Sequence, residues 1–200
     1  MGFGVSGGVV TVASGQIDQP RFEQFRATIW MERLARKGFL VTRQEIGGDH
    51  VTVVNTHLTA NYARDWSAEN GFTRVQIKEL DQLAAAVRRL PERDLVIVAG
   101  DFNFPASAPQ FEEFMAASGL ARAMDWSAVP ADARGFHEID NVHYRPPAGR
   151  RVAARAELCF QDQIRLRADA SRFPPTRRNR SRSRVVNVPA AAAPAPARPE

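Results

Sequence analysis

The pattern of apolar and polar residues predicts a β-hairpin over residues 36–58. The segments RKGFLVTRQEI and HVTVVNTHL are rich in β-branched and aromatic residues, and they flank the turn signal Gly47-Gly48-Asp49. Nearer the start, VVTVAS at residues 9–14 has a shorter run of the same kind. It indicates one further strand.

Two later segments have helical spacing. Apolar side chains recur at intervals of roughly three to four residues in the segment 72–90, and Pro91 ends the pattern; these side chains are Val75, Leu80, Leu83, Val87 and Leu90. A second helix is predicted over residues 109–118, with Gly119 as its C-terminal cap.

The remaining apolar runs predict strands. LVIVAG at residues 95–100 reads as a buried strand, and HEIDNVHYRP (137–146) with RRVAARAELCF (150–160) indicates a strand pair. Strands interleaved with helices are typical of a layered α/β or α+β domain.

Composition changes the picture only near the C-terminus. Residues 165–200 hold nine arginines and two acids, a net charge of +7. Because the whole chain has a net charge of +5, residues 1–164 carry a net charge of −2. We expect a folded domain over residues 1–166 and a disordered tail over 167–200, first basic and then rich in Pro and Ala. The single cysteine, Cys159, excludes an internal disulfide framework.

The candidate chemistry stands where two predicted strands end. VTVVNTHL ends in Asn55, Thr56 and His57, and LVIVAGDFN ends in Asp101 and Asn103. Strands of one sheet that finish side by side bring such clusters to a common rim. Imidazole transfers protons near neutrality, and a carboxylate with an amide can orient water, bind a hard cation and hold a phosphoryl oxygen. This combination suits phosphodiester hydrolysis.

NTHL, GDFN and EIDNVHYR, in this order, resemble the endonuclease/exonuclease/phosphatase superfamily. LARKGFL, NTHLTANY and TRVQIKEL are most similar to its neutral sphingomyelinase-like branch, and the resemblance covers roughly residues 8–166. It implies an α+β fold that is part of a four-layer α/β/β/α sandwich. It also implies a Mg²⁺-dependent phosphodiesterase, acting on a phospholipid or a nucleic acid.

The resemblance assigns roles by position. His57 corresponds to the histidine that contacts the scissile phosphate, and Asp101 to the aspartate that activates the attacking water. Asn103 corresponds to the asparagine that positions this water and binds the phosphate; Asp101 and Asn103 are the expected metal ligands. Asp140 corresponds to the aspartate that orients a final histidine.

Other family motifs are missing. The metal-binding Gln-Glu should precede Gly7, and a Ser-Asp-His should follow ELCFQDQIRL, but no histidine occurs after His143. We therefore expect a chain truncated at both ends. Gln44-Glu45 and Asp49-His50 imitate the missing pairs but belong to the predicted hairpin. For these two pairs we expect surface positions, and for His143 a hydrogen-bonded structural role.

Three functions follow from these observations. The first is a metal-dependent phosphodiesterase, and the second is a catalytically inactive fragment of one. The third is binding of nucleic acid or acidic partners through the Arg-rich tail, since clustered arginines bind phosphates. No apolar run reaches the roughly 20 residues of a bilayer-spanning helix. With no signal peptide pattern at the start, we expect a cytoplasmic monomer.

Overall fold

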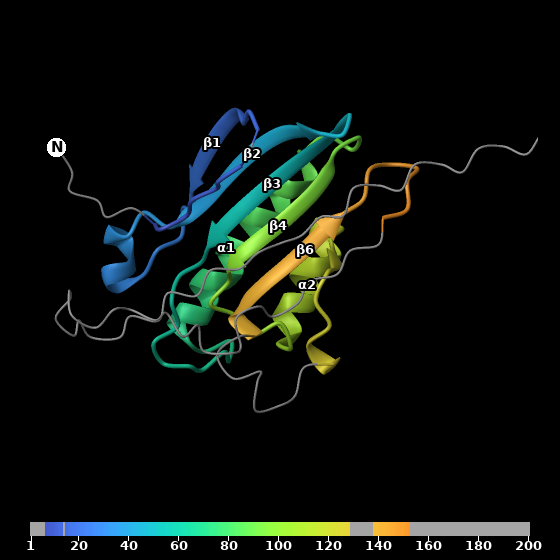
Figure 1. Ribbon diagram of the computed structural model, residues 1–200. Helices are drawn as coiled ribbons and strands as arrows, with labels where there is room; N and C mark the ends of the chain where they lie inside the picture. The colour runs from blue at the N-terminus through green and yellow to red at the C-terminus, as the bar shows by residue number, and fades with distance from the viewer. Residues whose placement is uncertain (1–6, 14, 129–137, 153–200) are drawn as a thin grey trace, which may run out of the picture. The chain divides into compact units, whose positions relative to one another are not determined.

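The computed structural model describes residues 7–13, 15–128 and 138–152. They fall in one compact unit, Met1–Ala154, whose described part contains a six-stranded mixed sheet with the order β1-β2-β3-β4-β6-β5 (Figure 1). Only β3 and β4 pair in parallel. The strands are β1 (Asp18–Gln24), β2 (Gly38–Ile46), β3 (Asp49–His57), β4 (Leu95–Asp101), β5 (Ala121–Arg122) and β6 (Asp140–Arg145).

The predicted hairpin is confirmed as β2 and β3. Ile46 pairs with Asp49, so Gly47 and Gly48 alone form the turn, with φ angles of +60° and +84°. A two-residue turn with both φ angles positive matches the right-handed twist of the flanking strands, and glycine adopts it without steric cost. The turn and the alternating side chains together set the register of the hairpin.

Both predicted helices are confirmed, as α1 (Gly71–Arg88) and α2 (Pro109–Ser118). Asn70 caps α1 by accepting a hydrogen bond from the Phe72 amide at 2.8 Å, and Gly119 ends α2 in the left-handed conformation at φ +69°. Two short 3₁₀ helices, η1 (Trp30–Leu34) and η2 (Trp126–Ala128), complete the described elements. Among the described helices, none has the length and hydropathy needed to cross a bilayer.

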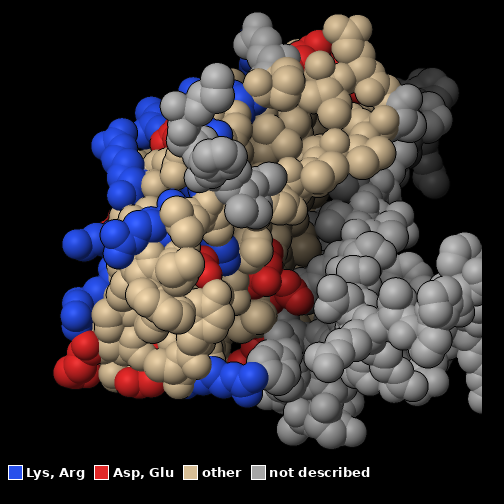
Figure 2. Space-filling model, turned by 90° about the vertical axis from the view of Figure 1, so that its left-hand side faces the viewer, with Lys and Arg blue, Asp and Glu red and all other residues tan. Residues whose placement is uncertain are grey.

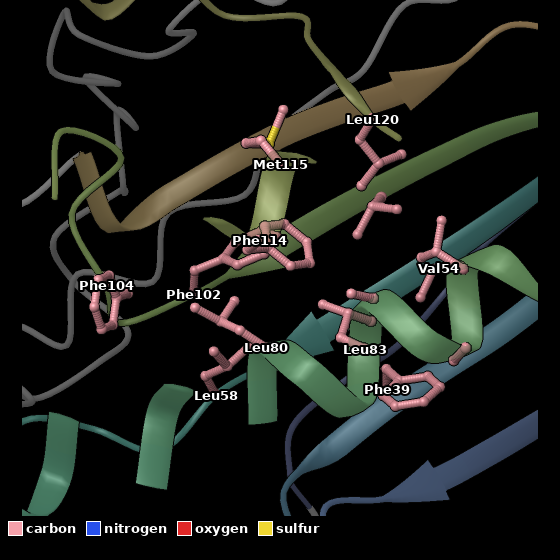
Figure 3. Packing of buried hydrophobic residues seen from close by; sticks show 14 of the residues in the cluster. Phe39, Val54, Leu58, Leu80, Leu83, Phe102, Phe104, Phe114, Met115 and Leu120 are labelled. Atoms are coloured by element: carbon pink, nitrogen blue, oxygen red, sulfur yellow. The ribbon is translucent and has the colours of Figure 1, made fainter. Parts of the chain in front are cut away.

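Both helices cover the same face of the sheet (Figure 1). The apolar side chains of this face meet those of α1 and α2 in one continuous core (Figure 3); among them are Phe39, Val54, Leu80, Leu83, Val98, Phe102, Phe111 and Phe114. The described residues thus form one sheet and one helical layer. This confirms the α+β prediction and accounts for two layers of the four-layer sandwich.

Two predicted strands differ from the structure. Residues 9–13 form no strand. Their backbone contacts a side chain of β3 instead of a neighbouring strand: the Asn55 amide donates to the carbonyl of Val10 at 2.8 Å. The first strand is instead β1, whose polar sequence and Pro20 gave no apolar signal but suit the sheet edge. Most of the predicted strand 150–160, and the tail 167–200, lie outside the described residues.

His143 is buried in an aromatic cluster rather than hydrogen-bonded. Its ring lies 5.4 to 6.3 Å from the ring centroids of Phe102, Phe111 and Phe114. Within the described residues neither ring nitrogen has a hydrogen-bond partner, so the expectation of a hydrogen-bonded structural histidine is wrong on that point. Burial lowers the pKa of His143 to about 3.

We expect His143 to make the fold acid-sensitive. Because its pKa is about 3 in the folded chain and 6.5 ordinarily, the unfolded chain binds the proton first as pH falls. Stability is full above pH 6.5 and decreases below it, by about 2 kcal/mol between pH 7 and pH 5. Urea unfolding at both pH values measures this loss, and His143→Phe should reduce it by that amount. Equal pH dependence of the two proteins would contradict the prediction.

Candidate active site

The parallel pairing of β3 with β4 brings the two predicted polar clusters together. Helix α1 connects the strands, and their register places His57 directly opposite Asp101. The His57 Nε2 atom lies 3.9 Å from Oδ2 of Asp101, and both side chains are partly exposed. Both project from the sheet face opposite the helices, because their neighbours Thr56 and Phe102 are buried with the core. The rim is therefore accessible to a ligand.

Gly100 permits the close approach of the strands at this point. Its φ is +153°, and a Cβ atom built on it would stand 1.9 Å from the carbonyl oxygen of Thr56. No side chain fits in that space. The glycine before Asp101 is thus a requirement of the β3–β4 pairing, which sets the position of Asp101 relative to His57.

Asn103 is held in the turn that follows β4. Its backbone has a φ of +48°, a left-handed conformation that asparagine tolerates better than most residues. The Asn103 amide N–H donates to Oδ1 of Asp101 at 2.8 Å, and its side-chain Nδ2 donates to the carbonyl of Leu58 at 3.0 Å. These bonds join the end of β4 to the residue after His57.

Asp140 lies at the same rim. It pairs with Asp101 in the β4–β6 ladder, so His57, Asp101 and Asp140 occupy one row across three strands. The Phe102 amide donates to the carbonyl of Ile139 at 2.7 Å, which anchors the start of β6 to the same turn. All four residues identified from the sequence are thus brought together. Their catalytic roles remain proposals.

Two charged residues of the site were not identified from the sequence. Lys37 Nζ lies 3.0 Å from His57 Nε2, donates to the carbonyl of Leu58 at 2.8 Å, and forms an ion pair with Glu32 at 3.0 Å. The side chains of Glu32 and Lys37 are only 7% and 9% exposed, so the pair is largely shielded from water. Tyr62 donates its hydroxyl proton to Glu32 at 2.6 Å. Lys37 directly precedes β2, but its spacing from His57 carries no local pattern.

These contacts determine the tautomer and the charge of His57. Its Nδ1–H donates to the carbonyl of Gly7 at 2.9 Å, so Nε2 is free of hydrogen and accepts from Lys37. Burial lowers the pKa of His57 most, and the Lys37 charge lowers it further. The Asp101 charge opposes both without reversing the shift. His57 is therefore neutral at pH 7.

Removing the lysine charge should raise the pKa of His57. The variant Lys37→Met keeps the apolar stem, and pairing it with Glu32→Gln avoids leaving a buried carboxylate without its partner. Titration of the His57 ring protons by nuclear magnetic resonance would show the increase. The exposed Lys78→Met is the matched control and should leave the pKa unchanged. A lower or unaltered His57 pKa in the double variant would contradict this electrostatic model.

Helix α1 braces both loops of the site through two buried polar side chains. Gln76 Nε2 donates to the carbonyls of Thr59, at 2.8 Å, and Asn103, at 2.7 Å. Glu79 accepts from the amide and the hydroxyl of Thr59, at 2.9 and 2.7 Å, and burial raises its pKa to about 7. Their signal was present in the sequence: two polar residues at i and i+3 lie beside Leu80 on the apolar face of a helix.

Gln44-Glu45 and Asp49-His50, the two pairs that resemble the missing family motifs, lie at the other end of the sheet. The β2–β3 ladder runs from Gly38 opposite His57 to Ile46 opposite Asp49, which places Glu45 and His50 beside the hairpin turn. Oxygen donors for a hard cation at the rim include the Asp101 carboxylate and the Asn103 amide, with the Asp140 carboxylate next to Asp101 in the strand register. No cluster of three or more His, Cys, Asp or Glu side chains suited to a metal occurs among the described residues.

Comparison with known proteins identifies a family and similar folds. A model of the Endonuclease/Exonuclease/phosphatase family matches residues 1–187. Phospholipase C from Staphylococcus aureus is 26% identical over 110 residues, which are 54% of this chain and 33% of that protein. The match thus spans about a third of the length of this curated relative.

Solved structures share the fold. A hairpin-deletion mutant of beta toxin from Staphylococcus aureus aligns with a TM-score of 0.66 at 15% identity, covering 86% of this chain and 66% of the toxin chain. A beta toxin structure with bound magnesium ions has a TM-score of 0.56 at 18% identity, covering 70% and 52%. For sphingomyelinase C from Streptomyces griseocarneus the TM-score is 0.51 at 21% identity, covering 68% and 52%.

Proposed function

Because this chain belongs to the endonuclease/exonuclease/phosphatase family, we propose that the rim at His57 and Asp101 hydrolyses phosphodiesters with the help of a divalent cation. The observation that carries the proposal is the register of β3 and β4. It sets His57 opposite Asp101 and brings Asn103 into the next turn. An imidazole, a carboxylate and an amide thus meet at one partly exposed point, and the largely buried Lys37 ammonium contacts the imidazole.

Four residues have roles that their geometry supports. Asp101 orients a water molecule and accepts its proton as the water oxygen forms a bond to phosphorus. Asn103 contributes an amide to a phosphoryl oxygen. The Lys37 ammonium, whose hydrogens already point to His57, the Leu58 carbonyl and Glu32, contributes only the field of its positive charge. The bond from phosphorus to the alkoxide oxygen breaks, and that oxygen takes up a proton from solvent. Gln76 keeps the loops that follow β3 and β4 in place.

Magnesium fits the donors at the rim. Mg²⁺ prefers hard oxygen ligands and is commonly bound by few protein groups together with waters and substrate phosphate. The Asp101 carboxylate and the amide oxygen of Asn103, which are joined in one turn, could supply such ligands. When bound, the cation would neutralise charge that develops on the phosphoryl oxygens. The magnesium ions in the beta toxin structure support the choice of this metal. We further propose that the catalytic domain spans residues 1–166.

Hydrolysis of bis-p-nitrophenyl phosphate by the full chain tests the proposal. We expect p-nitrophenolate release that depends on Mg²⁺, stops with EDTA and is about 10²- to 10⁴-fold slower in Asp101→Asn. A folded chain, as judged by circular dichroism, that releases no more product than this variant would favour the inactive alternative. The name of the curated relative, phospholipase C, favours a phospholipid over a nucleic acid as substrate. Parallel assays with sphingomyelin and single-stranded DNA distinguish the two.

A further inference from the structure

An exposed apolar cluster lies beside the candidate active site. Trp30, Met31 and Leu34 of η1 are 60%, 54% and 46% exposed, and Tyr62 is 61% exposed. The Trp30 and Tyr62 rings pack edge to face, with centroids 6.1 Å apart. We call these four residues the η1 patch. Single exposed apolar residues are normal, but a contiguous group of large ones marks an interaction surface.

The η1 patch is joined to the site by three successive contacts. Tyr62 donates to Glu32, which is the buried residue of η1. Glu32 forms the ion pair with Lys37, and Lys37 Nζ lies 3.0 Å from the His57 ring. A partner bound to the patch is therefore held next to the rim of His57 and Asp101.

Positive charge accompanies the apolar side chains. Arg33 lies within η1 and Arg36 just after it, and both are exposed, whereas the acid of this element, Glu32, is buried. Figure 2 views this side of the molecule and shows lysine and arginine side chains along its left edge, acidic side chains near its centre and lower edge, and uncharged residues over much of the rest. Indole, thioether and aliphatic groups beside guanidinium groups match the boundary between lipid headgroups and acyl chains.

We propose that the η1 patch docks this chain on a phospholipid surface. Trp30, Met31 and Leu34 enter the boundary region, while Arg33 and Arg36 contact headgroup phosphates. Docking would present headgroup phosphodiesters to His57, and this step rests on the function proposed above. The docking itself does not depend on that function.

The composition of the patch favours lipid over other partners. A surface for single-stranded nucleic acid uses flat aromatic faces on which bases stack. Here Tyr62 is held by edge contacts on both sides, at 6.1 Å to Trp30 and 5.8 Å to Phe72, and Met31 and Leu34 offer no stacking face. Exposed arginines would also repel one another across a symmetric contact between two copies of the chain.

Binding to vesicles tests the proposal without any assay of hydrolysis. The full chain is sedimented with vesicles of phosphatidylcholine, alone and with phosphatidylglycerol. Its tryptophan fluorescence is measured with brominated phosphatidylcholine, which quenches inserted rings. We expect Trp30→Ser/Leu34→Ser to bind about tenfold more weakly or worse, because two large apolar groups are lost. The tail is common to every variant, so its attraction to anionic lipid cancels.

The matched control is Val12→Ser/Ile46→Ser, which removes two exposed apolar side chains outside η1 and should bind like the natural sequence. Equal loss in both double variants would overturn the proposal. So would an effect of the patch variant on single-stranded DNA binding, or on self-association by sedimentation velocity, without an effect on vesicles. If vesicles bind but bis-p-nitrophenyl phosphate is not hydrolysed, the proposed function fails and the docking surface stands.

Discussion

Gly100→Ala is expected to lower the free energy of unfolding by about 3 kcal/mol or more. The added Cβ would stand 1.9 Å from the Thr56 carbonyl oxygen, so β3 and β4 could keep their register only by moving apart. The two strands form the centre of the sheet, and His57 and Asp101 depend on that register. Urea unfolding followed by circular dichroism measures the loss.

Gly119→Ala provides the matched control for this substitution. Gly119 also has a positive φ, of +69°, but nothing lies within 4 Å of its Cβ position. Alanine there should cost only the strain of the left-handed conformation, about 1 kcal/mol. If the two variants lost equal stability, the contact with Thr56 would not be what makes Gly100 necessary.

Asp101→Asn is expected to reduce kcat/KM for bis-p-nitrophenyl phosphate by about 10² to 10⁴. Asparagine keeps the size of the side chain and an oxygen that can accept the Asn103 amide hydrogen, so the turn after β4 should persist. It loses the negative charge that accepts a proton from water and attracts a cation. The unfolding midpoint should therefore change little while the rate falls.

Asp81→Asn is the matched control, since Asp81 is an exposed residue of α1. It should hydrolyse the substrate at the natural rate. A natural rate in Asp101→Asn as well would show that the reaction does not use this carboxylate. Mg²⁺ titration of both variants separates a weaker cation affinity from a slower chemical step, because only the former is overcome at high metal concentration.

The elements that the sequence revealed are those with a local cause. The β2–β3 hairpin follows from alternation and a Gly-Gly turn, and α1 from a 3.6-residue period, an Asn cap and the proline beyond its end. Strand β1 escaped prediction because an edge strand is stabilised by its neighbour and needs no apolar face of its own. The apolar run at residues 9–13 was predicted as a strand but forms none. Its backbone accepts a hydrogen bond from the Asn55 side chain and does not pair with another strand.

The four candidate residues lie at or just beyond strand ends: His57 ends β3, Asp101 ends β4, Asn103 follows in the next turn, and Asp140 begins β6. Short sequence motifs mark such positions. The residues that surround them in the folded chain could not be identified in this way. Lys37 lies 20 residues from His57 in the chain, and Gln76 lies 27 residues from Asn103. No periodicity links such pairs, since their contact is a product of strand pairing and helix packing. Lys37 nonetheless changes the chemistry, because with burial it keeps His57 neutral.

By itself the sequence determined the α+β elements, the family and the four candidate residues, because periodicity, turn chemistry and short motifs are local properties. Only the tertiary structure decided how these residues act on one another. Parallel pairing of β3 with β4 set His57 against Asp101, and η1 brought Glu32 to Lys37. Burial and the distance between charges determine a pKa, and both exist only once distant segments have packed together.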